Sequence, residues 1–502
     1  MNLKRSAGRS AAALIAAGLA GSLLAVPSAA EGAAPELEWG ACPEDVAAGA
    51  YPLRCATVPV PVNYADPDGP QIDLMISKLA SERPDRRRGV LLLNQGGPGG
   101  SGLNFSTFLA DQGLPASVLE SYDLIGMDTR GVGHSSPVSC GFTDEQAQYG
   151  NVPPYAVDDA AVTERAEVVR TIADQCAQHD QDGRLSSITT ANMARDLDRV
   201  RAALGEEKAN YYGASYGTAL GAAYASMFPE RADRVVLDSN IGDTVLDRDG
   251  MRRYALGTEQ TFPDFAAWVA ERHGSYGLGR TPEEVRRTYF EVAERLDARP
   301  MAGVDGAVFR LVIFGGLFGE PAYGRTAQLW QSLHDSDEAA VRQQLAESAP
   351  AGRSAAGLSP ADNSLTVFLA TTCNDVAWPE DVETYRRGVA EDREKFPVYG
   401  AATANVLPCA FWSHEPAEPP VPVLADGPAN VLLMQNRRDP VTPHEGAELL
   451  REKFGDRARL VSADESGHGT YLNSGNACAM AAGTAFLADG VLPEEDVSCP
   501  AS

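Results

Sequence analysis

The segment Gly213-Ala214-Ser215-Tyr216-Gly217 restricts the fold of this chain more than any other. It follows a short strand-like run, residues 210–212, and precedes a helix-forming stretch, residues 216–228, that is rich in alanine and glycine. A G-x-S-x-G pattern between a strand and a helix is typical of a sharp turn that exposes a serine hydroxyl at the edge of a parallel sheet. Ser215 is therefore a candidate nucleophile. The alternative is a glycine-rich turn in which the serine only caps the helix.

A second glycine-rich segment, Asn94–Gly102, directly follows the continuous apolar run Gly89–Leu93. Such a run predicts a strand buried on both faces. Glycines allow backbone N–H groups to turn toward a developing oxyanion, together with the N–H of the residue after the nucleophile. The predicted donors are Gly97 and Tyr216. A phosphate-binding loop is the alternative, but no Gly-Lys-Ser/Thr sequence follows.

An acid and a histidine occur further along the chain. Asp439 follows the apolar run 430–435, and Pro440 comes after it, while His468 lies on a glycine-flanked loop after the strand-like run 458–462. A carboxylate at a strand end can hold a histidine in one tautomer. Alone, Asp439 could be a helix N-cap and His468 a surface residue. The chain order serine, aspartate, histidine is that of α/β-hydrolases.

The remaining histidines favour no metal site. His414 and His444 are each followed by glutamate, as in some zinc motifs, but neither has a second histidine at the required spacing. His134, in the polar loop 128–135, is expected to brace the site. We predict no metal and no cofactor.

Several runs of residues in this chain resemble those of a known family. The runs 94–102, 128–135, 213–217, 436–443 and 466–469, together with Cys373-Asn374-Asp375, Trp378-Pro379 and the amino-terminal Leu37-Glu38-Trp39 with Cys42 and Cys55, resemble the secreted tripeptidyl aminopeptidases of actinomycetes. These are relatives of proline iminopeptidase within the α/β-hydrolase superfamily. The resemblance covers nearly the whole chain after residue 30.

The resemblance implies a serine exopeptidase that removes short peptides, commonly tripeptides, from free amino termini. Ser215 would be the nucleophile, Asp439 the orienting acid, and His468 the general base and acid. Proline iminopeptidases begin the glycine loop with histidine, whereas Asn94-Gln95 stand here, which favours the tripeptidyl branch. That branch also contains esterase-like members, so an extracellular carboxylesterase or lipase is the alternative.

The amino terminus predicts export. Basic residues precede an apolar stretch, 11–26, and the small residues Ser28-Ala29-Ala30 form a cleavage site, so residues 1–30 are expected to be a signal peptide of a secreted, extracellular protein. The formal net charge of −27 argues against nucleic acid as a partner and, after signal cleavage, against a membrane surface. The expected partners are peptides with free amino termini.

Eight cysteines in an exported chain predict disulfides. Spacing alone cannot choose among the 105 possible pairings. We favour sequential neighbours, because each such pair flanks one local excursion from the predicted core. The pairs are Cys42 with Cys55, Cys140 with Cys176, Cys373 with Cys409, and Cys478 with Cys499.

The pattern of strands predicts an α/β-hydrolase fold, a mostly parallel sheet flanked by helices, with an inserted, mainly helical cap. Residues 31–242 are expected to form the first part of the core, 243–425 the cap, and 426–502 the carboxyl-terminal part of the core. An aminopeptidase also needs a group that binds the substrate ammonium, and a buried carboxylate is the simplest one. Asp375 and Asp238 are the candidates, although a helix cap or a structural ion pair explains an aspartate equally well.

Overall fold

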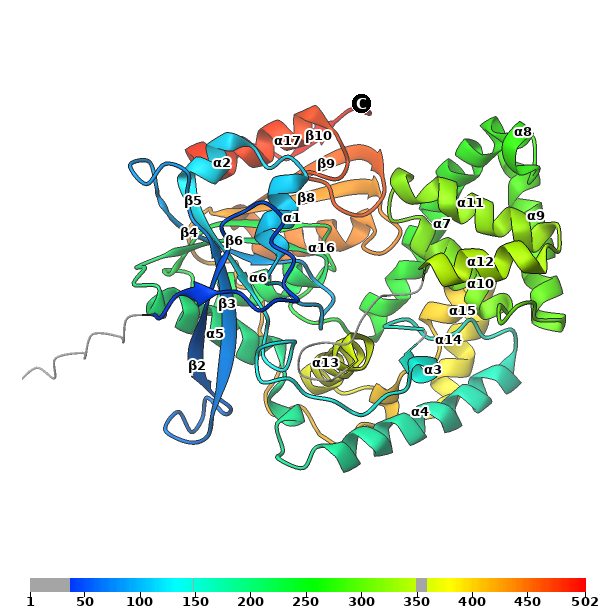
Figure 1. The fold of residues 1–502 in the computed structure, drawn as a ribbon, viewed down its shortest axis with the longest axis horizontal. Coiled ribbons are helices and arrows are strands. Elements are labelled where there is room, and N and C mark those ends of the chain that lie inside the picture. The colour runs from blue at the N-terminus through cyan, green and yellow to red at the C-terminus, as the bar shows by residue number, and fades with distance from the viewer. Residues whose placement is uncertain (1–36, 148, 349–358) are drawn as a thin grey trace, which may run out of the picture. The chain divides into compact units, whose positions relative to one another are not determined.

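The computed structural model describes residues 37–147, 149–348 and 359–502. The expected signal peptide, residues 1–30, lies outside the described residues. Within them a ten-stranded sheet has the order β1-β2-β3-β5-β4-β6-β7-β8-β9-β10 (Figure 1). Its strands are β1 (Gly40–Ala41), β2 (Arg54–Pro61), β3 (Gln71–Leu79), β4 (Gly89–Asn94), β5 (Tyr122–Met127), β6 (Ala209–Ala214), β7 (Ala232–Asp238), β8 (Val431–Arg438), β9 (Ala458–Ser466) and β10 (Val497–Cys499).

The sheet is antiparallel at its amino-terminal edge and parallel from β5 to β10. Every residue of β4 is buried, as its unbroken apolar sequence predicts for a strand covered on both faces. Alternate residues of β4 enter two different hydrophobic clusters: Val90 and Leu92 one, Leu91 and Leu93 the other. The carboxyl ends of the parallel strands therefore share one edge, between two layers of helices.

Helices cover both faces of the sheet. The apolar residues of α5 (Thr190–Ala203), α6 (Tyr216–Met227) and α16 (His444–Phe454) belong to the first cluster, and those of α1 (Phe105–Asp111), α2 (Ala116–Ser121) and α17 (Ala477–Thr484) to the second. Helix α6 packs closely because its residues are small. A Cβ on Gly221 would lie 2.3 Å from the Tyr211 ring and 2.5 Å from Leu237.

The chain between β7 and β8 is helical. It contains α7 (Arg248–Glu271), α8 (His273–Tyr276), α9 (Pro282–Ala298), α10 (Gly306–Gly316), α11 (Glu320–His334), α12 (Glu338–Ser348), α13 (Pro360–Asp375), α14 (Val382–Lys395), α15 (Gly400–Thr403) and the 3₁₀ turn η2 (Pro408–Phe411). Helices α8 to α12 group together in Figure 1. A cluster of buried rings, Phe265, Tyr289, Phe309 and Trp330, holds α7, α9, α10 and α11 together.

One helix packs with a part of the chain that is distant from it in sequence. Helix α4 (Asp159–His179) lies in the sequence between β5 and β6, with the short α3 (Asp144–Ala147) before it and the turn η1 (Leu185–Ser187) after it. Its residues Val162, Ala166 and Val169 nevertheless pack with Tyr385 and Val389 of α14. The segment expected as the first part of the core thus contributes a helix to the layer formed by residues 243–425.

Four disulfides use all eight cysteines, and they join the sequential neighbours that the sequence analysis favours. Cys140–Cys176 ties the loop after β5 to α4, and Cys373–Cys409 ties α13 to the turn η2. No helix in the described part of the chain is long and apolar enough to cross a bilayer.

We expect thiol alkylation under denaturing, non-reducing conditions to add no mass, because all eight cysteines are paired. Reduction should lower the free energy of unfolding by about 2–4 kcal/mol for each disulfide. Intact-protein mass spectrometry and urea denaturation measure the two effects. Alkylation of Cys373 or Cys409 without reductant would contradict the link between α13 and η2.

Candidate active site

Ser215 stands at the turn between β6 and α6 with a backbone φ of 58° and ψ of −126°. This positive φ is uncommon outside glycine and costs about 1–3 kcal/mol, so the surroundings must hold it. The Ser215 N–H donates to the carbonyl of Asp238, 2.9 Å away. A Cβ on Gly217 would lie 2.6 Å from the Asn94 carbonyl, and one on Gly213 would lie 2.3 Å from the Gly217 carbonyl. Both glycines of the motif are therefore required by close packing.

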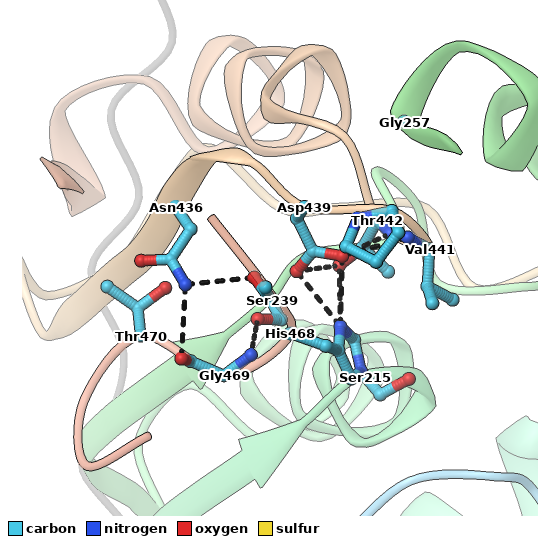
Figure 2. Close-up of polar contacts among 12 residues, drawn as sticks. Ser215, Ser239, Gly257, Asn436, Asp439, Val441, Thr442, His468, Gly469 and Thr470 are labelled. Carbon is cyan, nitrogen blue, oxygen red and sulfur yellow. Dashed lines mark hydrogen bonds and ion pairs between the residues drawn. The ribbon is translucent and has the colours of Figure 1, made fainter. Parts of the chain in front are cut away.

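Asp439 and His468 meet beside this turn. Asp439 follows β8 and His468 follows β9, so the parallel register brings them to the same edge. His468 Nδ1 lies 2.9 Å from Asp439 Oδ2 and 3.1 Å from Oδ1. The Asp439 carboxylate has no exposed surface and also accepts hydrogen bonds from the N–H groups of Val441 and Thr442 and from the Thr442 hydroxyl. In the view of Figure 2, the His468 ring lies between Asp439 and Ser215.

The Ser215 hydroxyl forms no hydrogen bond to any described residue. Catalytic hydrogen bonds are often long in substrate-free enzymes and tighten when substrate binds. The arrangement can therefore pass a proton from Ser215 to His468 Nε2 while Asp439 holds Nδ1 protonated.

The glycine loop lies against the nucleophile turn. A Cβ on Gly96 would come within 2.8 Å of Ser215 Cβ and 3.1 Å of Tyr216 N, and φ at Gly96 is 97°. The Gly96 N–H is already bonded to Asn94 Oδ1, at 2.9 Å. The N–H groups of Gly97 and Tyr216 donate to no acceptor among the described residues. They are the two donors that the sequence analysis predicts for an oxyanion, and both remain free for one.

Comparison with known proteins now identifies the family. A tripeptidyl aminopeptidase of Streptomyces lividans is 32% identical over 484 residues, covering 94% of this chain and 88% of the relative. The chain belongs to the tripeptidyl aminopeptidase family. A family model described as TAP-like protein matches residues 396–499, which carry Asp439 and His468.

Two other relatives differ in their stated activity. The serine protease Hip1 of Mycobacterium tuberculosis is 28% identical over 515 residues, 97% of this chain and 96% of the relative. A carboxylesterase B of the same species is 30% identical over 478 residues, 93% of this chain and 90% of the relative. The protein is thus a serine hydrolase with the α/β-hydrolase fold, and the peptidases among its relatives support a serine peptidase.

Asp238, one of the two carboxylates expected to bind the substrate ammonium, already accepts hydrogen bonds from other residues of the protein. Asp238 is buried at the end of β7, and its Oδ1 accepts the N–H of Thr470 at 2.7 Å. Its Oδ2 accepts the N–H of Tyr471 at 3.0 Å and the Tyr212 hydroxyl at 2.9 Å. Both oxygens serve the loop after His468, so the expectation for Asp238 does not fit the structure.

The Asp375 carboxylate also already accepts hydrogen bonds within the protein. Its two oxygens accept the N–H and hydroxyl of Thr190, at 2.8 and 2.5 Å, and it lines a cavity of about 10 Å³, room for about one water molecule. That cavity contains neither Ser215 nor His468. Asp375 is buried, and a cavity of this size has no room for the amino terminus of a peptide.

Two larger cavities meet at His468. One, of about 710 Å³, is lined by the carboxylates Asp264, Glu320 and Glu465 and, among the described residues, by no lysine or arginine. The other, of about 310 Å³, is apolar and is lined by Phe105, Phe108, Leu109 and Leu472. No sequence motif marks Glu320, because the helix α11 that carries it reaches His468 only in the folded chain. Phe318, just before α11, stacks edge-on against the His468 ring with centroids 5.4 Å apart.

The other histidines considered in the sequence, His134, His414 and His444, lie next to polar groups of the protein. His134 Nε2 lies 3.1 Å from Asp45, and His444 Nε2 lies 2.7 Å from the Ser462 hydroxyl. His414 faces Asp180 at 3.4 Å. Among residues 37–147, 149–348 and 359–502, no three His, Cys, Asp or Glu side chains gather in a way that could hold a metal ion.

Two carboxylates raise the pKa of His468. Burial alone lowers the pKa of His468, but the charge and hydrogen bond of Asp439 and the charge of Asp238 raise it more, so the pKa lies above its ordinary value of 6.5. A general base must be neutral in the free enzyme.

We therefore expect kcat/KM to fall as the pH drops through a midpoint above 6.5, because His468 becomes protonated and cannot accept the Ser215 proton. Initial rates between pH 5 and 9 on a peptide anilide measure this, with circular dichroism at each pH to confirm that the fold persists. A rate that stays constant from pH 8 down to pH 5.5 would contradict His468 as the base.

Proposed function

We propose that this protein is a secreted serine exopeptidase that removes short peptides, most often tripeptides, from free amino termini. The observation that carries the proposal is the His468–Asp439 pair, buried beside the strained Ser215 turn and open to a cavity lined with carboxylates. The family relationship supports peptidase activity. The expected leader and the four disulfides are consistent with an extracellular protein.

In the proposed mechanism, Ser215 Oγ attacks the scissile carbonyl carbon as its proton moves to His468 Nε2. The carbonyl oxygen becomes an oxyanion that accepts hydrogen bonds from the N–H groups of Gly97 and Tyr216. The C–N bond breaks as His468 returns the proton to the leaving amine, which leaves an ester on Ser215. Water then attacks this ester with His468 again as base. The ester C–O bond breaks, His468 returns the proton to Ser215 Oγ, and the peptide acid leaves.

The cavity of about 710 Å³ is the proposed site for the amino-terminal part of the substrate. Glu320 is the carboxylate that we propose for the ammonium. Asp264 is paired with Arg438, and Glu465 Oε1 accepts from Asn476 and the Ser502 N–H. Glu320 has no ion pair among the described residues, and Trp268 Nε1 donates to its Oε1 at 3.2 Å, which leaves Oε2 for a ligand.

Hydrolysis of carboxylic esters is the alternative function. It rests on the carboxylesterase B relative and on the apolar cavity beside His468, which offers room for an acyl or alcohol group. The catalytic residues would be the same. The two functions differ in whether the substrate needs a free ammonium.

Ser215→Ala should lower turnover by roughly four to six orders of magnitude, because the members of a triad act as a unit. The melting temperature should not fall, because the substitution removes only a hydroxyl without hydrogen-bond partners. Labelling with a fluorophosphonate probe, followed by peptide mapping, should find Ser215 alone. Turnover within tenfold of the wild type would exclude Ser215 as the nucleophile.

Glu320→Gln should lower kcat/KM on a free tripeptide anilide by about tenfold or more, because each decade corresponds to about 1.4 kcal/mol of lost transition-state stabilisation. The same variant should hydrolyse a neutral p-nitrophenyl ester at the wild-type rate. N-acetylation of the peptide should cause a similar loss in the wild type and little further loss in the variant.

The matched control is Glu283→Gln, which removes an exposed carboxylate from the first turn of α9, as Glu320→Gln does from α11. Its activity should stay unchanged. If free and acetylated peptides are cleaved equally well by the wild type, the exopeptidase proposal fails, and an endopeptidase or an esterase replaces it.

A further inference from the structure

A chain of buried side-chain hydrogen bonds joins the nucleophile turn to α13, which belongs to the helical layer formed by residues 243–425. The Tyr216 hydroxyl lies 2.6 Å from Thr190 Oγ1, and Thr190 Oγ1 donates to Asp375 Oδ2 at 2.5 Å. Thr190 also donates its backbone N–H to Asp375 Oδ1 at 2.8 Å. The three residues are at most 6% exposed, so bulk solvent has little access to these bonds.

Each member of the chain stands at the end of a helix. Tyr216 is the first residue of α6, Thr190 the first residue of α5, and Asp375 the last residue of α13. The N–H of Thr190 has no partner within α5, and a carboxylate is favourable at a helix amino terminus. The two bonds to Asp375 therefore hold the end of α13 against the start of α5. The bond between Thr190 and the Tyr216 hydroxyl holds the Tyr216 side chain relative to these two helices.

Burial of Asp375 is costly, since it raises the pKa of this carboxyl to about 7. Glu418, which is paired with Arg195, lines the same small cavity and also raises the pKa of Asp375.

The other end of α13 touches the glycine loop. A Cβ on Gly99 would lie 2.3 Å from the carbonyl oxygen of Ser364, in the first turns of α13, and φ at Gly99 is 102°. The backbone of the loop thus rests directly on α13, two residues from Gly97. Helix α13 therefore contacts the glycine loop directly and reaches Tyr216 through Thr190.

We propose that α13 positions the oxyanion site, and that the chain Asp375–Thr190–Tyr216 sets the direction of the Tyr216 backbone N–H. The inference rests on the proposed function, in which this N–H stabilises the oxyanion. A donor displaced by a fraction of an ångström stabilises a transition state less while substrate binding is unaffected. Asp375, Thr190 and the Tyr216 side chain are positioning residues and do not touch the substrate.

Tyr216→Phe and Thr190→Val test the chain with small changes in volume. Both should lower kcat about tenfold, less than the 10²–10³ lost with a whole oxyanion donor, and leave KM within twofold. Thr190→Ser keeps the hydroxyl and should restore kcat to within twofold of the wild type. Tyr224→Phe, which removes a buried hydroxyl from the same helix but none from the chain, is the matched control.

A transition-state analogue separates positioning from stability. Affinity for a peptidyl trifluoromethyl ketone, whose adduct carries an oxyanion, should fall in Tyr216→Phe by the same factor as kcat/KM. Rates are referred to active sites counted by fluorophosphonate titration, so loss of folded protein does not enter. If Tyr216→Phe and Thr190→Val keep kcat within twofold, or if Thr190→Ser is as slow as Thr190→Val, the proposal is wrong.

Measurement on a neutral ester keeps this result apart from the exopeptidase proposal. An ester uses the same oxyanion site but no ammonium, so the chain variants should lose rate on ester and anilide alike. Loss of the ammonium requirement would contradict only the exopeptidase proposal. An active Ser215→Ala enzyme would contradict the catalytic assignment itself.

Discussion

The end of strand β7 holds the two halves of the candidate site together. The carbonyl of Asp238 accepts the N–H of Ser215, while its carboxylate accepts the N–H groups of Thr470 and Tyr471. The next residue, Ser239, accepts the N–H of Gly469 through its hydroxyl. The strained serine turn and the loop that carries His468 are thus both bonded to Asp238, and Ser239 adds a second bond to the loop. Figure 2 shows Ser239 bonded to Gly469 of this loop.

This arrangement explains why a fully buried carboxylate stands next to the proposed general base, His468, without a role in the proposed proton transfer. Asp238 satisfies backbone donors that no strand or helix would satisfy, which offsets the cost of its burial. Its charge also raises the pKa of His468. Asp439 differs from it because its oxygens face the imidazole, so Asp439 orients the ring and Asp238 orients the loop.

The helical layer contributes more than a cover. Helix α11 brings Glu320 to the cavity at His468, and α13 reaches the glycine loop and, through Thr190, the residue after the nucleophile. Cys373–Cys409 joins α13 to η2, and α4 packs on α14 nearby. The residues that would select a substrate and those that would stabilise the oxyanion are therefore held by the same layer.

Local patterns were enough to predict much of this protein. Strand β4, the turn at Ser215 and the chain order of Ser215, Asp439 and His468 depend on neighbours in sequence and on the parallel register, so residue types and spacing predict them. The roles of the carboxylates depend instead on distant donors. Asp375 and Asp238 look like free acids in the sequence, but Thr190 and the turn at Thr470 occupy them. Glu320 looks like an ordinary helix start. Only the packing of helices far apart in the chain decides which carboxylate faces the cavity, because burial and hydrogen-bond partners are properties of the folded chain.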